Sequence, residues 1–223
     1  MKKKITLCLI LCIVIFLCVG LYKFLLFKKY PINVSNINGF YNNLENLPIT
    51  ITHEISNEKI GNLNISIPQE FQEKKSIDEN SKIYTLNDII EIWIAKKDRP
   101  FIEDVDENEK AMYETIFEKY NINNELDLIK IHKNHKLDKV KFLWSKSKIM
   151  FHHIASEYIN KLTEFGQNTK CYYLTNDLDG FLIQGPKFIT AYIFNDDESY
   201  ILRFNTKDFS IEKTTKILST IHF

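Results

Sequence analysis

The chain contains 223 residues, enough for one domain with its own hydrophobic core and an additional segment. Its 29 basic and 29 acidic side chains balance overall, but six lysines and no acid lie in residues 1–30, which leaves 23 basic against 29 acidic residues in the remainder. Only two of those bases are arginines. A nucleic-acid-binding domain needs a basic face that commonly carries arginine, so we expect no nucleic-acid partner.

Residues 1–30 have the composition of a membrane anchor. An uncharged apolar stretch of 18 residues runs from Ile5 to Tyr22, preceded by three lysines and followed by Lys23, FLLF and two more lysines. A helix needs about 20 residues to cross the hydrocarbon core of a bilayer. Residues 5–27 reach that length if the Lys23 side chain extends to the membrane interface. The sequence therefore predicts a lipid-embedded helix over residues 5–27.

A cleaved signal peptide is the alternative interpretation of this segment. Its apolar region would be shorter and would end in small residues, for which Cys18-Val19-Gly20 is a poor match. We therefore favour an uncleaved anchor. The amino-terminal lysines favour a cytoplasmic N-terminus, which would place residues 31–223 outside the cytoplasm.

The cysteine content indicates a domain without disulfides. Cys8, Cys12 and Cys18 lie in the apolar stretch, which leaves Cys171 without a partner in the remainder of the chain. The domain must therefore rely on its core rather than on cross-links. We expect Cys171 at the start of a strand, with no neighbouring base that would activate it as a nucleophile.

Residues 31–48 are rich in asparagine and lack periodicity, so they are predicted to form a linker to a domain over residues 49–223. Alternating and β-branched apolar runs predict strands in that domain. Asn87-Asp88 is predicted to form a tight hairpin turn between two of them. The predicted strands cover residues 49–56, 63–67, 82–86, 89–95, 171–175, 181–184, 187–194 and 199–205.

Apolar stripes at helical spacing predict helices over residues 107–119, 147–165 and 210–220. Asp106 and Glu109 form a capping box for the first helix, and Gly166 ends the second. Residues 126–131 suit a strand by alternation and a helix by their flanks, and both assignments stay open. The predicted fold class is α+β, an antiparallel β-sheet packed by helices behind an N-terminal transmembrane anchor.

The adjacent histidines in KIMFHHIASEY, residues 148–158, are the first candidates for chemistry. At about 100° per helical residue, His153 falls opposite the apolar face of the helix and His152 falls on its shoulder. Adjacent helical residues cannot chelate one ion. His153 with Glu157 would supply two ligands, whereas a zinc site needs three or four. We therefore expect a solvated helix face.

His132 and His135 have a spacing that could chelate a metal on a helix, but Lys130, Lys133 and Lys136 surround them and would repel a cation. The acidic runs at residues 104–108 and 176–180 resemble calcium loops in part. The first has Glu109 where that loop requires glycine, and the second has Pro186 at its last ligand position. No catalytic, cofactor-binding or metal-ligating residue is therefore assigned, and no cofactor is expected.

Two segments resemble the Mog1/PsbP-like α/β/α sandwich family. NLNISIPQEF at residues 62–71 resembles the opening strand of that fold, and FSIEKTTKILSTIHF at residues 209–223 is similar to its terminal helix and short tail. The predicted hairpin 82–95 and the strands of 171–205 come in a compatible order. Domains of this family are typically non-catalytic binding or assembly modules, so the resemblance implies a docking role and supplies no catalytic residues.

These patterns together predict a single-pass protein of the cell membrane, and the bias toward Lys, Ile and Asn indicates a bacterial source. We expect a binding or accessory module without catalytic activity that docks an envelope protein, with the lipid bilayer as a second partner through residues 5–27. One alternative is an enzyme, a hydrolase or a metal-dependent one, that uses the histidines of the helical block. The other is a secreted soluble factor, which would result if the apolar segment were cleaved.

Overall fold

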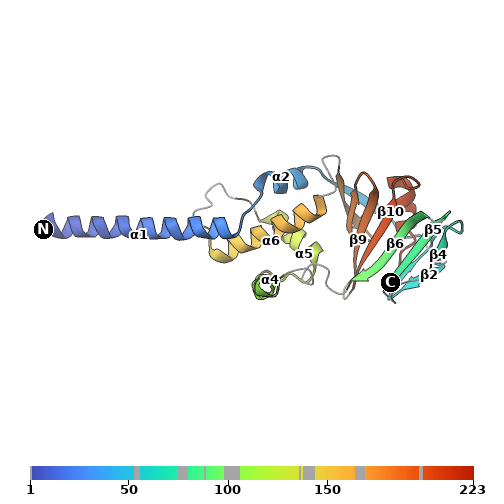
Figure 1. The fold of residues 1–223 in the computed structure, drawn as a ribbon, viewed down its shortest axis with the longest axis horizontal. Helices are drawn as coiled ribbons and strands as arrows, with labels where there is room; N and C mark the ends of the chain where they lie inside the picture. Colours follow the sequence, from blue (N-terminus) through green and yellow to red (C-terminus); the bar gives the residue numbers. More distant parts are fainter. Residues whose placement is uncertain are drawn as a thin grey trace.

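The computed structural model describes residues 2–52, 56–74, 80–87, 89–97, 106–135, 137, 144–163, 169–195 and 198–223. A long helix, α1 (Lys2–Lys29), projects from one end of the molecule, and a layer of helices lies between it and a large β-sheet (Figure 1). The structure is therefore mixed α and β, as predicted.

Helix α1 confirms the predicted apolar helix. Its segment Ile10–Lys29 has a mean hydropathy of 2.7 and is long and apolar enough to cross a membrane. Most apolar side chains between Ile10 and Leu25 are exposed. Length and composition of this kind suit both a membrane anchor and a signal sequence.

The predicted linker over residues 31–48 is wrong. Helix α2 (Val34–Asn42) begins after the Asn33 cap, whose side chain accepts a hydrogen bond from Asn36 N, and strand β1 (Leu44–Ile49) follows. Ile37 and Phe40 are the buried residues of α2, and this narrow apolar face explains why no periodicity was evident. The strand expected over 49–56 is misplaced, because only its first residue, Ile49, belongs to a strand, β1, and residues 50–52 form none. Residues 53–55 lie outside the described part of the chain.

Eight strands form the main sheet in the order β1-β7-β8-β9-β10-β6-β5-β4. β1 pairs parallel with β7 and every other neighbouring pair is antiparallel, so the predicted meander is confirmed. The remaining strands of the sheet are β4 (Gln72–Lys74), β5 (Ser81–Leu86), β6 (Ile89–Lys97), β7 (Lys170–Asn176), β8 (Asp179–Gln184), β9 (Phe188–Asn195) and β10 (Glu198–Asn205).

Strands β2 (Glu58–Ile60) and β3 (Leu63–Ile65) form a separate hairpin. The strand predicted over 63–67 is therefore shorter than expected, although its alternating apolar side chains are buried as the pattern requires. Asn87 adopts a positive φ of 50° after β5, as a tight turn there demands, while its neighbour Asp88 lies outside the described residues.

Helices α4 (Glu107–Tyr120), α6 (Lys146–Thr163) and α7 (Ile211–Leu218) confirm the three predicted helices. Helix α5 (Glu125–Asn134) resolves the ambiguous segment in favour of a helix, and its Asn124 cap accepts a hydrogen bond from Asp127 N. The predicted stop at Gly166 lies outside the described residues.

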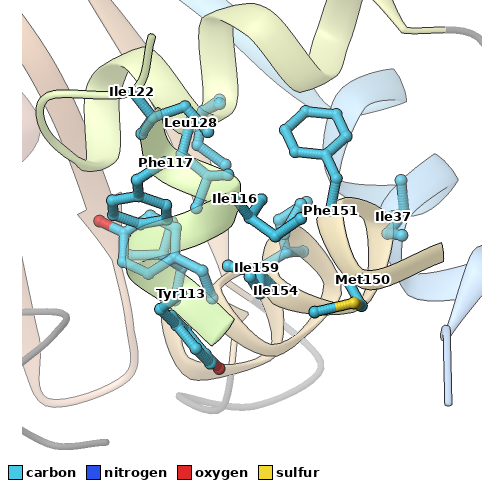
Figure 2. Close-up of a cluster of buried hydrophobic side chains, with 14 of the residues drawn as sticks. Ile37, Tyr113, Ile116, Phe117, Ile122, Leu128, Met150, Phe151, Ile154 and Ile159 are labelled. Atoms are coloured by element: carbon cyan, nitrogen blue, oxygen red, sulfur yellow. The ribbon is translucent and has the colours of Figure 1, made fainter. Parts of the chain in front are cut away.

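The sheet separates two hydrophobic cores. Phe181 and Ile183 of β8 face the core formed by α2, α4, α5 and α6, while Leu182 between them faces the core formed by α7 and the β2–β3 hairpin. In the first core, α6 contacts α1, α2, α4 and α5. Figure 2 shows the side chains of α4, α5 and α6 meeting there, with Ile37 of α2 beside them. Helix α6 is therefore the central helix of the layer.

Candidate functional site

The adjacent histidines of α6 are buried, which corrects the predicted solvated face. His152 is 0% exposed and His153 is 4% exposed. The spacing of the apolar residues identifies one apolar arc on α6, but α6 contacts α1, α2, α4 and α5, which all precede it in the sequence. Because α2 and the end of α1 cover the arc that carries His153, a polar position on the wheel became a buried position in the fold.

Tyr41, His132 and His152 form a hydrogen-bonded chain across three helices. Tyr41 Oη of α2 lies 2.9 Å from His132 Nδ1 of α5, and His132 Nε2 lies 2.8 Å from His152 Nδ1 of α6. The chain is enclosed by aromatic rings, with the Trp144 ring centroid 4.5 Å from that of His152. Burial lowers the pKa of His132 to about 4, and the nearby His135 lowers it further in the same direction. His132 is therefore neutral at physiological pH.

His153 points toward the end of α1 instead. Its Nδ1 lies 2.7 Å from the Pro31 carbonyl oxygen, and its ring lies 5.5 Å from the Tyr30 ring between centroids. His153 and Glu157, which were considered above as two possible ligands, lie 3.6 Å apart between Nε2 and Oε1. Glu157 also accepts a hydrogen bond from Tyr113 Oη at 2.6 Å. The pair is thus part of the contacts that hold α4, α6 and the chain after α1 together.

His132 and His135, whose spacing could have suited a metal, lie in different environments. His132 is buried, whereas His135 is exposed as the residue that caps the end of α5. Among the described residues, no group of three or more His, Cys, Asp or Glu side chains could hold a metal ion. The acidic run at 176–180 forms the turn between β7 and β8, with Asn176 at a φ of 75°. The run at 104–108 lies partly outside the described residues.

Cys171 lies near the start of β7, where it was expected, and is 6% exposed. Burial raises the pKa of its thiol to about 11. The thiolate is the nucleophilic form of cysteine, and burial suppresses it here. Cys171 therefore acts as a small apolar side chain in the core.

Glu91 is a buried carboxyl group that the sequence did not single out. Tyr84 pairs with Ile92 and Thr85 pairs with Ile90, so Glu91 occupies a β-bulge between them. Glu91 is 3% exposed, and its Oε2 makes no hydrogen bond within the described residues. Burial raises the pKa of Glu91 to about 6, and the neighbouring Asp208 carboxylate adds to the rise. In the sequence, the only sign of this buried carboxyl group is an acidic residue within an apolar run.

The last turns of α1 are built into the helical layer. Leu26 and Tyr30 belong to the buried core, and the Phe27 ring centroid lies 6.2 Å from that of Trp144. Lys23 Nζ donates a hydrogen bond to the Trp144 carbonyl oxygen. The apolar helix and the domain therefore share one packed junction.

Comparison of the chain with protein-family models, with curated proteins and with solved structures finds no match. The resemblance to the Mog1/PsbP-like family therefore stays a prediction.

Proposed function

We propose that this chain is a single-pass protein of a bacterial cell membrane whose domain lies outside the cytoplasm and docks an envelope protein without catalysing a reaction. The observation that carries the proposal is the junction between α1 and the helical layer. Leu26 near the end of α1 and Tyr30, the residue that follows the helix, are each 7% exposed, although the rest of α1 is largely exposed. A helix mounted in this way would hold the domain in a defined position above the bilayer.

The junction also indicates where the lipid-embedded part would end. Lys23 donates to the domain at Trp144 and Leu26 packs into it, so the membrane segment would end near Tyr22. The 18 residues from Ile5 to Tyr22 would span about 27 Å as a helix at 1.5 Å per residue. That length is close to a hydrocarbon core of about 30 Å. The proposed span is therefore shorter at its end than the 5–27 expected from sequence alone.

The buried state of the histidines favours binding over catalysis. An enzyme of the helical block would need His132 or His152 to reach a substrate, and both rings lie inside the core against Tyr41 and Trp144. The geometry supports a structural role for the chain of hydrogen bonds, which ties α2, α5 and α6 together. The raised pKa of Cys171 argues in the same direction.

Crosslinking capture on intact cells tests the proposal. The full-length protein with a C-terminal tag is compared with residues 1–30 carrying the same tag, followed by mass spectrometry of the captured proteins. We expect at least one envelope protein that is captured only when residues 31–223 are present. Identical capture by the bare anchor would contradict a docking role for the domain.

A further inference from the structure

A polar cavity of about 420 Å³ opens at the end of the sheet where β7 turns into β8 and where β9 ends. The beginning of α5 forms the facing wall. Four asparagines, three aspartates and one lysine line the cavity together with two phenylalanines and a leucine. Its volume lies within the roughly 300–1,000 Å³ that small-ligand sites occupy. The proposed docking function does not explain why these polar side chains converge here.

Each of the three aspartates is held in place through one carboxylate oxygen. Asp127 Oδ2 accepts from the backbone and the side chain of Asn123, at 3.0 and 3.1 Å. Asp177 Oδ2 accepts from Ile51 N at 3.0 Å, and Asp179 Oδ1 lies 3.3 Å from Lys130 Nζ. The second oxygen of each carboxylate makes no hydrogen bond to another described residue. The cavity thus offers carboxylate acceptors to a ligand that brings donors.

The arrangement excludes two simple classes of ligand. Three carboxylates against one ammonium group give the cavity a negative charge, which disfavours phosphate and other anions. Among the described residues, no group of three His, Cys, Asp or Glu side chains could hold one metal ion, so the three carboxylates do not form a metal site by themselves. A suitable ligand must therefore carry several donors spread over the width of a small molecule.

The apolar side chains that line the cavity restrict the possible ligands further. The Phe223 side chain is 45% exposed and Phe194 lines the same cavity. Aromatic rings give an apolar surface beside the polar acceptors. A sugar ring has a face of C–H groups with hydroxyl donors around its edge, so it matches both parts of the lining. Asparagine amides can donate to and accept from neighbouring hydroxyls.

We propose that this cavity binds an uncharged or amine-bearing sugar ring of a glycan. The inference deepens the proposed function, on which it rests for the placement of the cavity outside the cytoplasm, and it gives the docking domain a carbohydrate ligand. The sugar would place its hydroxyl donors on the open oxygens of Asp127, Asp177 and Asp179 and one ring face against Phe223.

Saturation-transfer NMR on the full-length protein in an amine-oxide detergent tests this proposal, because detergents with sugar headgroups would compete. The probes are glucose, glucosamine and N-acetylglucosamine at millimolar concentration, with trilysine as a charge control. Asp179→Asn and Phe223→Ala change exposed side chains at the rim of the cavity. Glu114→Gln removes the same charge from an exposed position on α4 and serves as the matched control.

We expect saturation transfer to at least one sugar and an affinity at least tenfold lower in Asp179→Asn and Phe223→Ala, with Glu114→Gln unchanged. No transfer to any of the three sugars, an equal loss in Glu114→Gln, or preference for trilysine over every sugar would each overturn the inference. A failed sugar test with a captured protein partner would leave the docking proposal intact. Sugar binding without any captured partner would instead refute the protein-docking proposal alone.

Discussion

The hydrogen-bonded chain of Tyr41, His132 and His152 places ionisable side chains in the core, away from the water that would stabilise their charged forms. Burial keeps His132 neutral, and a neutral imidazole can donate from one nitrogen and accept at the other. The two hydrogen bonds of the chain can therefore form without a net charge. This arrangement makes the helical layer sensitive to acid, because protonation of His132 would place a positive charge inside the core.

We predict that acid destabilises the protein through His132. Its folded pKa of about 4 lies below the ordinary value of 6.5, so the unfolded chain binds more protons between these values and stability falls as the pH falls from about 6.5 toward 4. At pH 5 the loss would be about 2 kcal/mol. Urea unfolding in detergent at pH 7.5 and pH 5 measures it. His132→Gln should weaken the protein at pH 7.5 but remove most of this pH dependence, and an undiminished dependence in the variant would exclude His132 as its source.

Glu91 has the opposite dependence. Its folded pKa of about 6 lies above the ordinary 4.5, so the folded state binds more protons between these values and stability falls as the pH rises through that window. Glu91→Gln should therefore raise the free energy of unfolding by roughly 1–2 kcal/mol at pH 7.5. The same substitution should change little at pH 4, where Glu91 is protonated in both states. Glu45→Gln, at an exposed position of β1, is the control. A variant less stable at pH 7.5 would show that the Glu91 carboxylate has a favourable partner.

At the scale of elements, helix α2 and strand β1 lie in a segment that the sequence analysis predicted to be a linker, and α2 shows why. Periodicity identifies a helix when its apolar face is wide, as in α6, or when a cap marks its start, as Ser210 does for α7. Helix α2 has a face of two buried residues, and its partner α6 lies more than 100 residues further along the chain. The burial of α2 therefore depends on contacts with a distant part of the chain, which no local sequence pattern reveals.

The candidate site shows the same limit. The i, i+4 spacing of His153 and Glu157 allows their contact, because that contact is local to one helix. The contacts of His152 with His132, and of His153 with Pro31, join distant segments and turned a predicted wet face into a buried one. The polar cavity likewise combines a helix start, a hairpin turn and a strand end.

The junction of α1 with the helical layer gives a prediction with a matched control. Leu25 is 54% exposed and Leu26 is 7% exposed, although they are neighbours in one apolar helix. Leu26→Ala should lower the free energy of unfolding by about 2–3 kcal/mol, as large-to-small changes in a core do. Leu25→Ala should cost less than about 0.5 kcal/mol. Urea unfolding of the full-length protein in detergent compares them, and equal losses would show that α1 does not pack into the domain.

At the scale of the whole molecule, an apolar helix, a helical layer and a sheet follow one another along the long axis (Figure 1). The described contacts join the first two parts at α6 and the last two through the core around Phe181. We infer that packed side chains, rather than a short flexible linker, hold the domain in its position relative to α1. The proposed function therefore depends on where α1 resides and on which side of the membrane the domain lies.

Protease treatment of intact cells tests that dependence most directly, with one tag at each end of the full-length protein and a cytoplasmic protein as the integrity marker. We predict that external protease removes the C-terminal tag, that the N-terminal tag survives on a membrane-bound fragment, and that alkaline extraction does not release the protein. A C-terminal tag that is protected until the cells are lysed would contradict the proposed orientation. A mature protein in the medium that lacks residues 1–20 would contradict the anchor itself.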